Sequence, residues 1–295
     1  MDFRQARYFL AVVENEGING AADALSVAQP TVSQALRSLE RELGVQLFFR
    51  IGRGMVLSAA GRSLIGPSRQ LLRDVTAVED MLAADDGEVA GRLDIAAFPG
   101  LGTGEFLDLV ARYRGAYPKV SVRISDLRGE SSSAGVIRDG HSEFVLAHLP
   151  VEGGDGLDVI ELGSQEYWLV YPPGTELPEG TVRLAELPDI PMVFVPRGGS
   201  LGDAIEAGIR DSGARPPIAV LTEHREARLP LVLAGVGGSL VERSVAELAK
   251  DRVVVRRCEP SFTRAFGLVF NAGALSPVGQ AFVDLVRDHR AGRTS

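Results

Sequence analysis

The sequence predicts a helical head with a helix-turn-helix and a hairpin wing, then a long helix, and then an α/β domain. Three observations predict this fold class. Residues 20–43 read as two short helices joined by a tight turn, residues 59–84 carry apolar side chains at helical spacing, and strand-like and helix-like segments alternate after residue 91. Alternation of this kind is typical of a mostly parallel sheet covered by helices.

The head begins with a predicted helix over residues 3–14 and continues into the helix pair. In the second helix of the pair, Val32, Leu36, Leu39 and Leu43 recur at spacings of four, three and four, which predicts one buried stripe. Such a helix can enter a major groove with its N-terminal half, where Gln can bond adenine and Arg can bond guanine. The candidate DNA-contacting residues there are Gln29, Pro30, Thr31, Ser33, Gln34 and Arg37.

A hairpin is predicted over residues 46–57, with Gly52, Arg53 and Gly54 at its tip. A wing of this kind lies against the DNA backbone or minor groove, so Arg50 and Arg53 are candidate phosphate contacts. The alternative is that both arginines are solvated residues of a turn.

The long helix is predicted to begin after Ser58, a suitable N-cap, and to contain Pro67 as a kink. Its apolar stripe has a heptad-like spacing, which favours pairing with a second copy of the chain. A dimer would bind two half-sites, so the DNA target would be pseudo-palindromic. The alternative is a single helix packed on the following domain. The stripe consists of Leu64, Leu71, Val75, Val78 and Leu82.

Residues 85–91 are polar and contain glycine, which predicts a hinge and a domain boundary. The predicted organisation is therefore a DNA-binding head over residues 1–58, a dimerisation helix and hinge over 59–90, and an α/β domain over 91–295. We expect this hinge and the long helix to be the only connection between the α/β domain and the head.

The N-terminal 75 residues resemble the DNA-binding domain of LysR-type transcriptional regulators in the order and spacing of a set of residues. The matching residues are Ala21, Ala22, Leu25, Gln29, Pro30, Ser33, Leu39, Glu40, Leu43, Gly44, Leu47, Phe48 and Arg50. Ala28, Gln34, Ile18 and Phe49 depart from the family pattern. The departure at Gln34 bears on the target sequence more than on DNA binding itself.

The resemblance implies a winged helix-turn-helix, a dimer made by the long helix, and a periplasmic-binding-protein-like effector domain with two lobes. Lobe I would cover about 91–160 and 266–295, and lobe II about 161–265. It also implies a tetramer built as a dimer of dimers, a double-stranded DNA operator, a small organic effector, and RNA polymerase as a candidate partner. In the second domain the likeness is looser and includes the stretches YRGAYPKVSV and AGVGGSLVER.

In such a domain the ligand lies beyond the carboxyl ends of strands and near helix N-termini. Hydroxyls and N-terminal N–H groups suit a carboxylate or phosphate, and Arg197 could supply a counter-charge. Where the family often has Ser or Thr, this sequence has Phe98, Pro99 and Leu101, which favours a less polar pocket and a bulkier or aromatic effector. The alternative is that the Ser and Thr residues are only helix caps. The candidate effector-binding residues are Phe98, Pro99, Gly100, Thr103, Ser131, Ser132, His148, Arg197, Ser200, His224 and Gly237.

The main alternative to a DNA-binding regulator is an enzyme. Gly198, Ser200 and Gly202 fit the G-x-S-x-G pattern of a serine hydrolase, with His224 and His289 downstream. Pro196 and Arg197 extend the connection beyond the sharp turn that the pattern needs, so we expect no catalytic residues. A third class, a ligand-binding or scaffolding protein whose helix pair does not read DNA, is favoured only by the acidic charge and by Ala28.

Composition limits the remaining classes. The net charge is −8 over 295 residues, although residues 1–60 carry six arginines against six acidic residues. We therefore expect modest, salt-dependent non-specific DNA binding. A single cysteine, Cys258, excludes an intramolecular disulfide and a multi-cysteine metal site, and the metal and phosphate-loop motifs are missing. We expect no cofactor, no metal, no membrane span and a cytoplasmic location.

Overall fold

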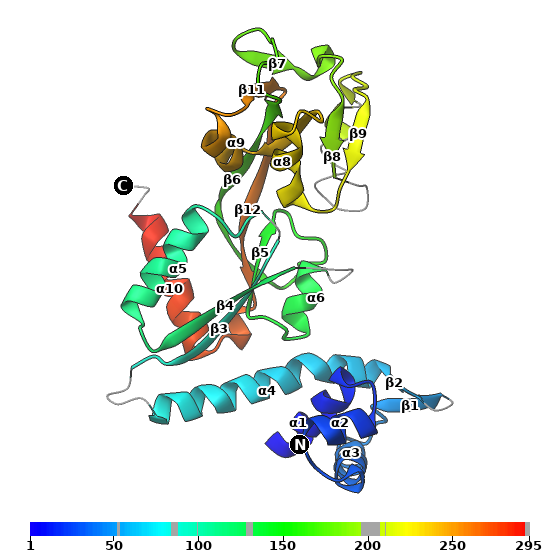
Figure 1. The fold of residues 1–295 in the computed structure, drawn as a ribbon. Helices are drawn as coiled ribbons and strands as arrows, with labels where there is room; N and C mark the ends of the chain where they lie inside the picture. Colours follow the sequence, from blue (N-terminus) through cyan, green and yellow to red (C-terminus); the bar gives the residue numbers. More distant parts are fainter. Residues whose placement is uncertain are drawn as a thin grey trace. The chain divides into compact units, whose positions relative to one another are not determined.

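The computed structural model describes residues 1–51, 54–83, 88–98, 100–127, 132–195, 207–209 and 211–292. The chain divides into two compact units. Unit 1 consists of Met1–Phe98, Glu105–Ile160 and Leu268–Ser295, and unit 2 consists of Pro99–Gly104 and Glu161–Gly267. The head, the long helix and the first α/β lobe belong to unit 1, and the second lobe forms unit 2 (Figure 1).

The head contains three helices and a two-stranded hairpin, as predicted. They are α1 (Phe3–Glu14), α2 (Ile18–Ala24), α3 (Gln29–Leu43), β1 (Phe48–Ile51) and β2 (Gly54–Leu57). The two strands pair antiparallel. Phe9, Leu39 and Leu47 are fully buried in the core that these elements share, which holds the helix pair and the wing on one support.

The predicted stripe of α3 is buried over most of its length. Val32, Leu36 and Leu39 are at most 4% exposed, whereas Leu43 is 39% exposed. The prediction was wrong for Leu43 because the helix runs past the head core in its last turn. Gly44 ends the helix with φ +70°, a left-handed conformation that glycine adopts without strain.

The long helix α4 (Ala59–Ala83) is continuous, with Pro67 in its interior. The Ser58 hydroxyl accepts a hydrogen bond from the Gly61 N–H at 2.9 Å, so Ser58 caps the helix as predicted. Leu64 packs against the head core within the same chain, which removes it from a seam between two chains. Farther along the helix, Val78 is 49% exposed and Leu82 is 78% exposed.

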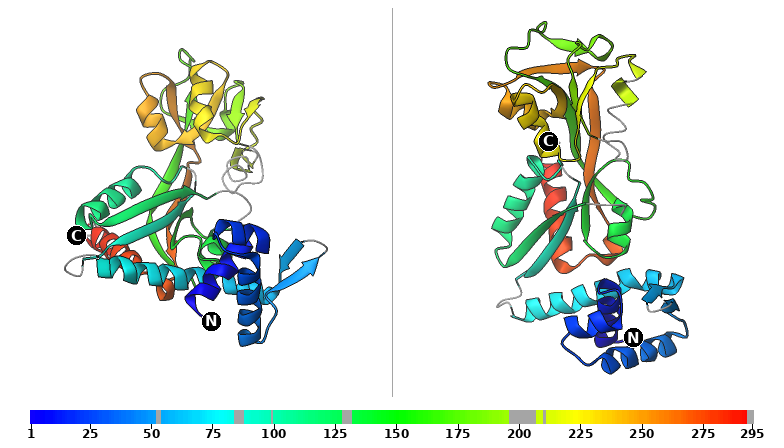
Figure 2. Two further views of the ribbon diagram at one scale, coloured as in Figure 1. Left: turned by 60° about the horizontal axis from the view of Figure 1, so that its bottom comes forward. Right: turned by 45° about the vertical axis from the view of Figure 1, so that its right-hand side comes forward.

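Lobe I is a parallel arrangement built from β3 (Gly91–Ala97), β4 (Val120–Asp126) and β5 (Phe144–His148), in which β3 pairs with both neighbours. Helices α5 (Glu105–Ala116) and α10 (Pro277–Ala291) lie side by side on it (Figures 1 and 2). The Tyr113 hydroxyl donates to the Val278 carbonyl at 2.6 Å, and this bond joins the two helices. Helix α6 (Ser133–Arg138) precedes β5.

Unit 2 continues the sheet, whose strand order is β4-β3-β5-β12-β6-β10-β8-β9. Strand β6 pairs antiparallel with both β10 and β11, and the β10-β8-β9 run is parallel, which agrees with a two-lobed α/β domain. The remaining strands and helices are β6 (Asp158–Tyr171), β7 (Thr181–Arg183), β8 (Met192–Phe194), β9 (Ile218–Leu221), α8 (Arg228–Leu233), β10 (Gly238–Glu242), α9 (Arg243–Ala249), β11 (Val254–Glu259) and β12 (Phe262–Phe270).

Three features of unit 2 differ from the sequence prediction. Strand β6 begins at Asp158, nine residues before the predicted strand at Tyr167, and its residues up to Ile160 lie in unit 1. Strand β7 and helix α9 were not predicted, since three and seven residues are too short for a clear periodicity. Most of the helix predicted at 202–211 lies outside the described residues.

Helix α4 also contacts lobe I directly. The Arg69 guanidinium donates to the Asp139 carbonyl at 2.8 Å, and the Arg73 guanidinium donates to the Gly140 carbonyl at 2.6 Å. The hinge and the long helix were expected to be the only connection between the head and the α/β domain, and these bonds show that the side of α4 is itself joined to lobe I. A contact between residues that are 70 positions apart leaves no periodic signal in the sequence.

Candidate DNA-reading surface and candidate effector site

The N-terminal half of α3 presents most of the predicted DNA-contacting residues to solvent. The exposed residues are Gln29, Pro30, Thr31, Gln34 and Arg37. Ser33 is the exception, since it is only 8% exposed and lies beside Val32 on the inner face of the helix. We therefore remove the Ser33 side chain from the candidate base contacts.

The wing is tied to the reading helix by Glu40, which the sequence did not single out as a site residue. Its Oε1 accepts hydrogen bonds from the N–H groups of Leu47 and Phe48, at 2.8 Å and 3.4 Å. This carboxylate fixes the first residues of the wing against α3. Arg50 follows on β1 and is exposed, whereas Arg53 lies outside the described residues.

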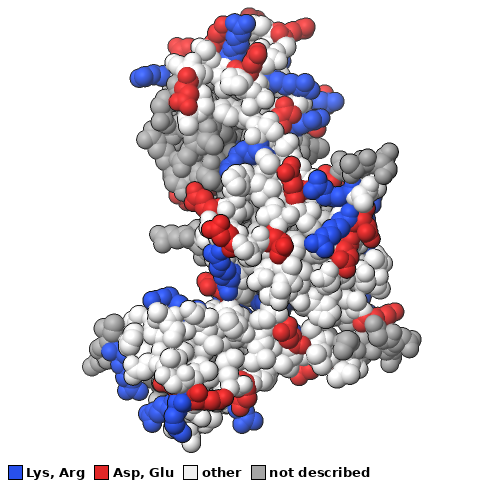
Figure 3. Space-filling model, turned by 180° about the vertical axis from the view of Figure 1, so that it is seen from behind, with Lys and Arg blue, Asp and Glu red and all other residues white. Residues whose placement is uncertain are grey.

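Charges on the head are mixed. Basic and acidic side chains both appear on the face of the head seen in Figure 3, in agreement with equal numbers of arginine and acidic residues over positions 1–60. Attraction to phosphate is therefore local to the arginines around α3 and the wing rather than a property of the whole head.

The described members of the predicted effector-binding set are divided between the two units. In unit 1, the Phe98 and His148 rings meet edge to face with centroids 5.2 Å apart. The Ser132 hydroxyl accepts from the Gly135 N–H at 3.0 Å and so acts as a helix cap, the alternative given for such residues. Pro99, Ser131, Arg197 and Ser200 lie outside the described residues.

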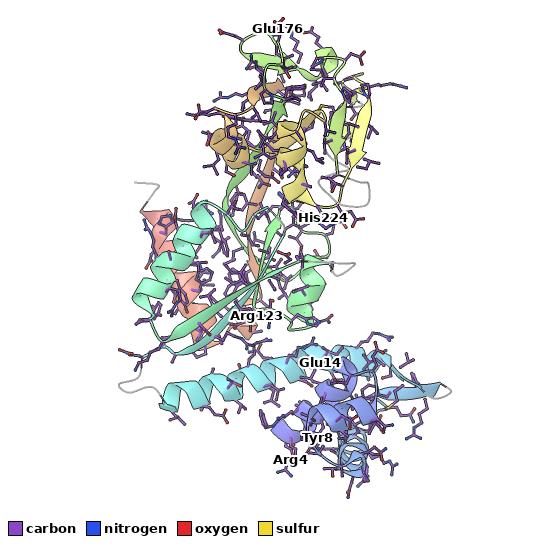
Figure 4. The ribbon with its side chains drawn as sticks, in the orientation of Figure 1. Arg4, Tyr8, Glu14, Arg123, Glu176 and His224 are labelled. Carbon is purple, nitrogen blue, oxygen red and sulfur yellow. The ribbon has the colours of Figure 1, made fainter. Side chains whose placement is uncertain are left out.

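Three other predicted residues have structural explanations. A Cβ atom on Gly237 would lie 2.1 Å from the Pro191 carbonyl oxygen, so glycine is needed there for backbone packing. His224 is 79% exposed at its side chain and interacts with Glu226 at 3.3 Å (His224 is labelled in Figure 4). Thr103 is exposed, with its hydroxyl 3.4 Å from the Gly100 carbonyl, and the following helix begins only at Glu105.

A buried ion pair forms the centre of a polar cluster in unit 2. The Arg228 guanidinium donates to both carboxylate oxygens of Glu242, at 3.0 Å and 2.7 Å, and also to the Leu240 carbonyl at 2.5 Å. The side chains of the pair are only 3% and 6% exposed. Arg225 lies 3.6 Å from the same carboxylate and is 16% exposed, so it is more accessible to solvent than Arg228.

Gly100, one of the candidate effector-binding residues, closes one side of this cluster. It has φ +91°, and a Cβ atom built on it would lie 3.0 Å from Glu242 Oε1 and 3.8 Å from Arg225 Nη1. The Gln165 side chain donates to the Gly100 carbonyl at 2.9 Å and accepts a short hydrogen bond from the Tyr167 hydroxyl. The glycine thus lets its own backbone approach the buried charges closely.

Three arginines and one glutamate influence the pKa of Tyr167. Burial raises the pKa of Tyr167, the nearby Glu242 raises it further, and Arg225, Arg264 and Arg228 lower it. Two of these guanidinium groups, those of Arg225 and Arg228, approach the Glu242 carboxylate at 3.6 Å and 2.7 Å. Burial lowers the pKa of Arg225, but the neighbouring Glu242 opposes that shift, and an arginine remains charged. Such a site suits an anionic group.

Sequence reasoning missed Gln165, Tyr167, Arg228 and Glu242. They lie on β6, on β10 and at the start of α8. The only local signal is that Glu242 and Arg228 are charged residues inside otherwise apolar elements, which is unusual unless the charges are paired.

The hydrolase motif finds no support in the described part of the chain. Gly198, Ser200 and Gly202 lie outside it, and His224 pairs with Glu226. His289 interacts with Glu105 at 3.6 Å in unit 1. Among the described residues no group of His, Cys, Asp and Glu is arranged to hold a metal ion, and no helix is long and apolar enough to span a membrane.

Two family comparisons cover nearly the whole chain. Residues 3–62 match the family described as "Bacterial regulatory helix-turn-helix protein, lysR family", and residues 86–291 match the "LysR substrate binding domain". Among curated relatives, the regulator TcbR of Pseudomonas sp. (strain P51) is 31% identical, covering 97% of this chain and 98% of the relative. OxyR of Escherichia coli (strain K12) is 26% identical over 99% and 95% of the two chains.

Solved structures agree with these relatives. CbnR, a LysR family transcriptional regulator, aligns over 98% of this chain and 99% of its own with a TM-score of 0.66 and 25% identity. The full-length CbnR complex with its target DNA aligns with a TM-score of 0.65, 26% identity and the same coverage. A full-length OxyR variant from Pseudomonas aeruginosa, at 19% identity and a TM-score of 0.71 over 97% and 95% of the chains, shares the fold.

The matches place a DNA-binding domain at the N-terminus and an effector-binding domain after it, in agreement with the reading surface on α3 and the α/β lobes. The proteins of this family are transcriptional regulators and not enzymes. The chain belongs to the LysR family of DNA-binding transcriptional regulators.

Proposed function

We propose that this regulator responds to a small organic anion held by the polar cluster around Arg225 in unit 2. The observation that carries the proposal is the geometry at Glu242, where the guanidinium groups of Arg225 and Arg228 approach one carboxylate, at 3.6 Å and 2.7 Å. Glu242 is already committed to Arg228 through two hydrogen bonds. The partly exposed Arg225 is therefore the group that can turn toward a ligand carboxylate.

Thermal unfolding in the presence of small carboxylates tests this proposal. A panel of aliphatic and aromatic mono- and dicarboxylates, with the corresponding neutral amides as controls, separates anion binding from general solvent effects. A bound ligand raises the melting temperature as its concentration rises. We expect Arg225→Gln to abolish the shift, and Arg252→Gln, which removes an exposed arginine of the same unit, to retain it. Equal shifts in both variants would place the anion elsewhere.

We further propose that α3 reads a pseudo-palindromic operator through Gln29, Thr31, Gln34 and Arg37, with Pro30 shaping the first turn of the helix. Arg50 and Arg53 on the wing would contact phosphates. The CbnR complex with its target DNA supports a DNA-bound role for this architecture. A mobility shift on the DNA upstream of the chain's own gene, compared with a scrambled fragment at several salt concentrations, tests it. Equal affinity for the two fragments would contradict sequence-specific reading.

Self-association through α4 is part of the same proposal. Val78 and Leu82 are exposed apolar residues, and Leu71 and Val75 on the same helix are half-buried. A second copy of α4 would cover this stripe and place two reading helices on two half-sites. The tetramer and a contact with RNA polymerase remain expectations of the family. Sedimentation of the full chain, with and without operator DNA, measures whether a tetramer forms.

We infer that Cys258 is not a peroxide sensor, although relatives of this chain include a "Hydrogen peroxide-inducible genes activator". The Cys258 thiol is 4% exposed, burial raises its pKa, and its sulfur lies 3.7 Å from the Tyr167 carbonyl. A redox-sensing cysteine needs an accessible thiolate. Mass spectrometry after treatment with peroxide should find native Cys258 unmodified, and a sulfenic or sulfinic acid there would contradict the inference.

A further inference from the structure

The long helix α4 and lobe I approach each other at a pair of glycines. A Cβ atom on Gly66 would lie 1.9 Å from the Arg138 carbonyl oxygen, so no other residue fits without moving the helix. Gly140 has φ +65°, and a Cβ atom built there would lie 3.0 Å from the Arg69 Cβ and 3.3 Å from the Gly66 carbonyl oxygen. The two backbones are therefore in direct contact.

Arg69 joins three elements beside these glycines. One guanidinium nitrogen, Nη1, donates to the Asp139 carbonyl at 2.8 Å and lies 3.0 Å from His141 Nε2. The other, Nη2, donates to Glu14 at the end of α1 at 3.1 Å (Glu14 is labelled in Figure 4). The Arg69 side chain is only 13% exposed. A single guanidinium thus links the head, α4 and the turn after α6.

Arg73 makes a second link one turn farther along α4. Its Nη1 donates to the Gly140 carbonyl at 2.6 Å, and its Nη2 donates a short hydrogen bond to the Gln70 side chain, which orients the guanidinium. Together, Arg69 and Arg73 satisfy two consecutive carbonyls of the turn at 139–140. The turn is therefore fastened by hydrogen bonds to charged donors, which are stronger than neutral ones.

The same helix is part of the head core. Leu64, Ile65 and Leu72 of α4 pack against the buried cluster formed by α1, α2 and α3. One side of α4 is thus anchored in the DNA-reading head, and the side that carries Gly66, Arg69 and Arg73 is anchored on lobe I. Because packed interiors deform little, a displacement of the turn at 139–140 must move α4 or break this contact.

We propose that Gly66, Arg69 and Arg73 form a latch that fastens the DNA-reading head to lobe I and sets the position of α3 relative to that lobe. Movement of lobe I then reaches the head through this contact rather than only along the chain that follows α4. The latch involves no DNA contact and none of the residues around Arg225. Its test is therefore independent of the proposed operator and effector.

An engineered disulfide tests whether the latch is closed in the full-length protein. Arg69→Cys with Gly140→Cys tests this, because a Cβ atom on Gly140 would lie 3.0 Å from the Arg69 Cβ, and an outward shift of roughly 0.5 Å reaches the range of about 3.5 to 4.5 Å found in disulfides. The Gly66 contact and Arg73 remain to hold the latch closed in this variant. Arg69→Cys with Gly156→Cys is the matched control. Gly156 also has a positive φ, +76°, but a Cβ atom there has no neighbour within 4 Å.

We expect rapid oxidation to a disulfide within one chain for the 69/140 pair, seen by non-reducing electrophoresis and peptide mapping, and at least tenfold slower oxidation for the 69/156 pair. Native Cys258 is buried and should not compete. Equal rates for the two pairs, or a disulfide between chains only, would overturn the latch.

Gly66→Ala tests what the latch does. Spin labels at Arg4→Cys in the head and Asp108→Cys in lobe I, both exposed, report the distance between head and lobe when labelled chains are diluted with unlabelled ones. We expect one narrow distance distribution in the parent and at least a twofold broader one in Gly66→Ala. Gly115→Ala is the control, because it also adds a methyl group to a helix glycine but has no neighbour within 4 Å.

Arg69→Ala with Arg73→Ala is the second variant, in case Gly66→Ala disturbs folding of α4. It removes the hydrogen bonds to the turn at 139–140 and adds no bulk. We expect it to broaden the distribution as well, with the helix content of the parent retained by circular dichroism. If a folded latch variant keeps the narrow distribution of the parent, the proposal is wrong.

Discussion

The Arg228 guanidinium of unit 2 bonds both oxygens of the Glu242 carboxylate, at 3.0 Å and 2.7 Å, in a position where neither side chain is more than 6% exposed. Breaking such a pair leaves one buried charge without compensation. We expect Glu242→Ala to lower the free energy of unfolding of unit 2 by about 3 to 5 kcal/mol. Glu242→Gln should cost less, because an amide oxygen still accepts from Arg228.

Thermal or urea unfolding followed by circular dichroism measures this loss. Glu247→Ala is a suitable control, since Glu247 pairs with Arg243 at 2.7 Å on the surface, where an ion pair contributes at most about 1 kcal/mol. A similar loss for both variants would mean that the buried pair has no special role in stability.

Gln34 and Arg50 should have different effects on DNA binding. Gln34 is exposed on the reading helix, so Gln34→Ala should weaken operator binding by about 1 to 3 kcal/mol and leave random DNA nearly unchanged. Arg50→Ala should weaken both kinds of DNA and lower the slope of log affinity against log salt by about one. Fluorescence anisotropy at several salt concentrations measures both quantities, and identical profiles for the two variants would refute the assignment.

A charge in the apolar stripe of α4 should disrupt self-association. Val75→Glu would bury a carboxylate against its own symmetry mate if Leu71, Val75, Val78 and Leu82 form the seam. We expect monomers by sedimentation velocity. Ser63→Glu, at an exposed position of the same helix, should keep the oligomeric state of the parent. An unchanged oligomer in Val75→Glu would remove the seam from this helix.

Acid should weaken the packing around His141. Burial lowers the pKa of His141 from its ordinary value of 6.5, and Arg69 lowers it further, while Asp139 and Glu14 oppose the shift. A pKa that is lower in the folded state means that the unfolded state binds more protons. The contribution of His141 to stability is therefore complete above about pH 6.5 and is lost as the pH falls through the lowered pKa.

The measurement is the free energy of unfolding in urea at about pH 7.5 and about pH 5.5, the latter one unit below the ordinary value of 6.5. His141→Asn cannot titrate, so it should lose less stability than the parent between these two values. A parent and variant with the same pH dependence would show that His141 does not contribute. Other groups that titrate in this range contribute equally to the parent and the variant, so their contributions cancel in the comparison. Glu143, whose pKa is raised by burial, is one of them.

Local patterns predicted the elements of the head with few errors, because neighbours in sequence create them. The stripe of Val32, Leu36 and Leu39 follows the helical repeat, and Gly44 supplies the left-handed residue that ends the helix. The stripe of α4 was also predicted, but its first residue, Leu64, belongs to the head core. Periodicity identifies an apolar face and does not identify what covers it.

The sequence cues to an effector site are ambiguous for a related reason. Candidate residues were chosen at strand ends and helix starts. One of them, Ser132, caps α6, and another, Gly237, packs against Pro191. Hydroxyls at helix starts serve as caps and as ligand contacts alike, and sequence cannot separate the two. The charged cluster of unit 2 was missed because its members come from separate strands and helices.

The sequence alone determined the class of this protein, since the residues that make a reading helix, its turn and its cap are consecutive and interact within a few positions. Tertiary structure decided which polar residues meet. The close approach of Gly100 to Glu242, and of Gly66 to the turn at Gly140, joins segments 142 and 74 positions apart. Such meetings depend on the strand order and on how α4 docks, and therefore on the free energy of packing the whole chain rather than on any local pattern.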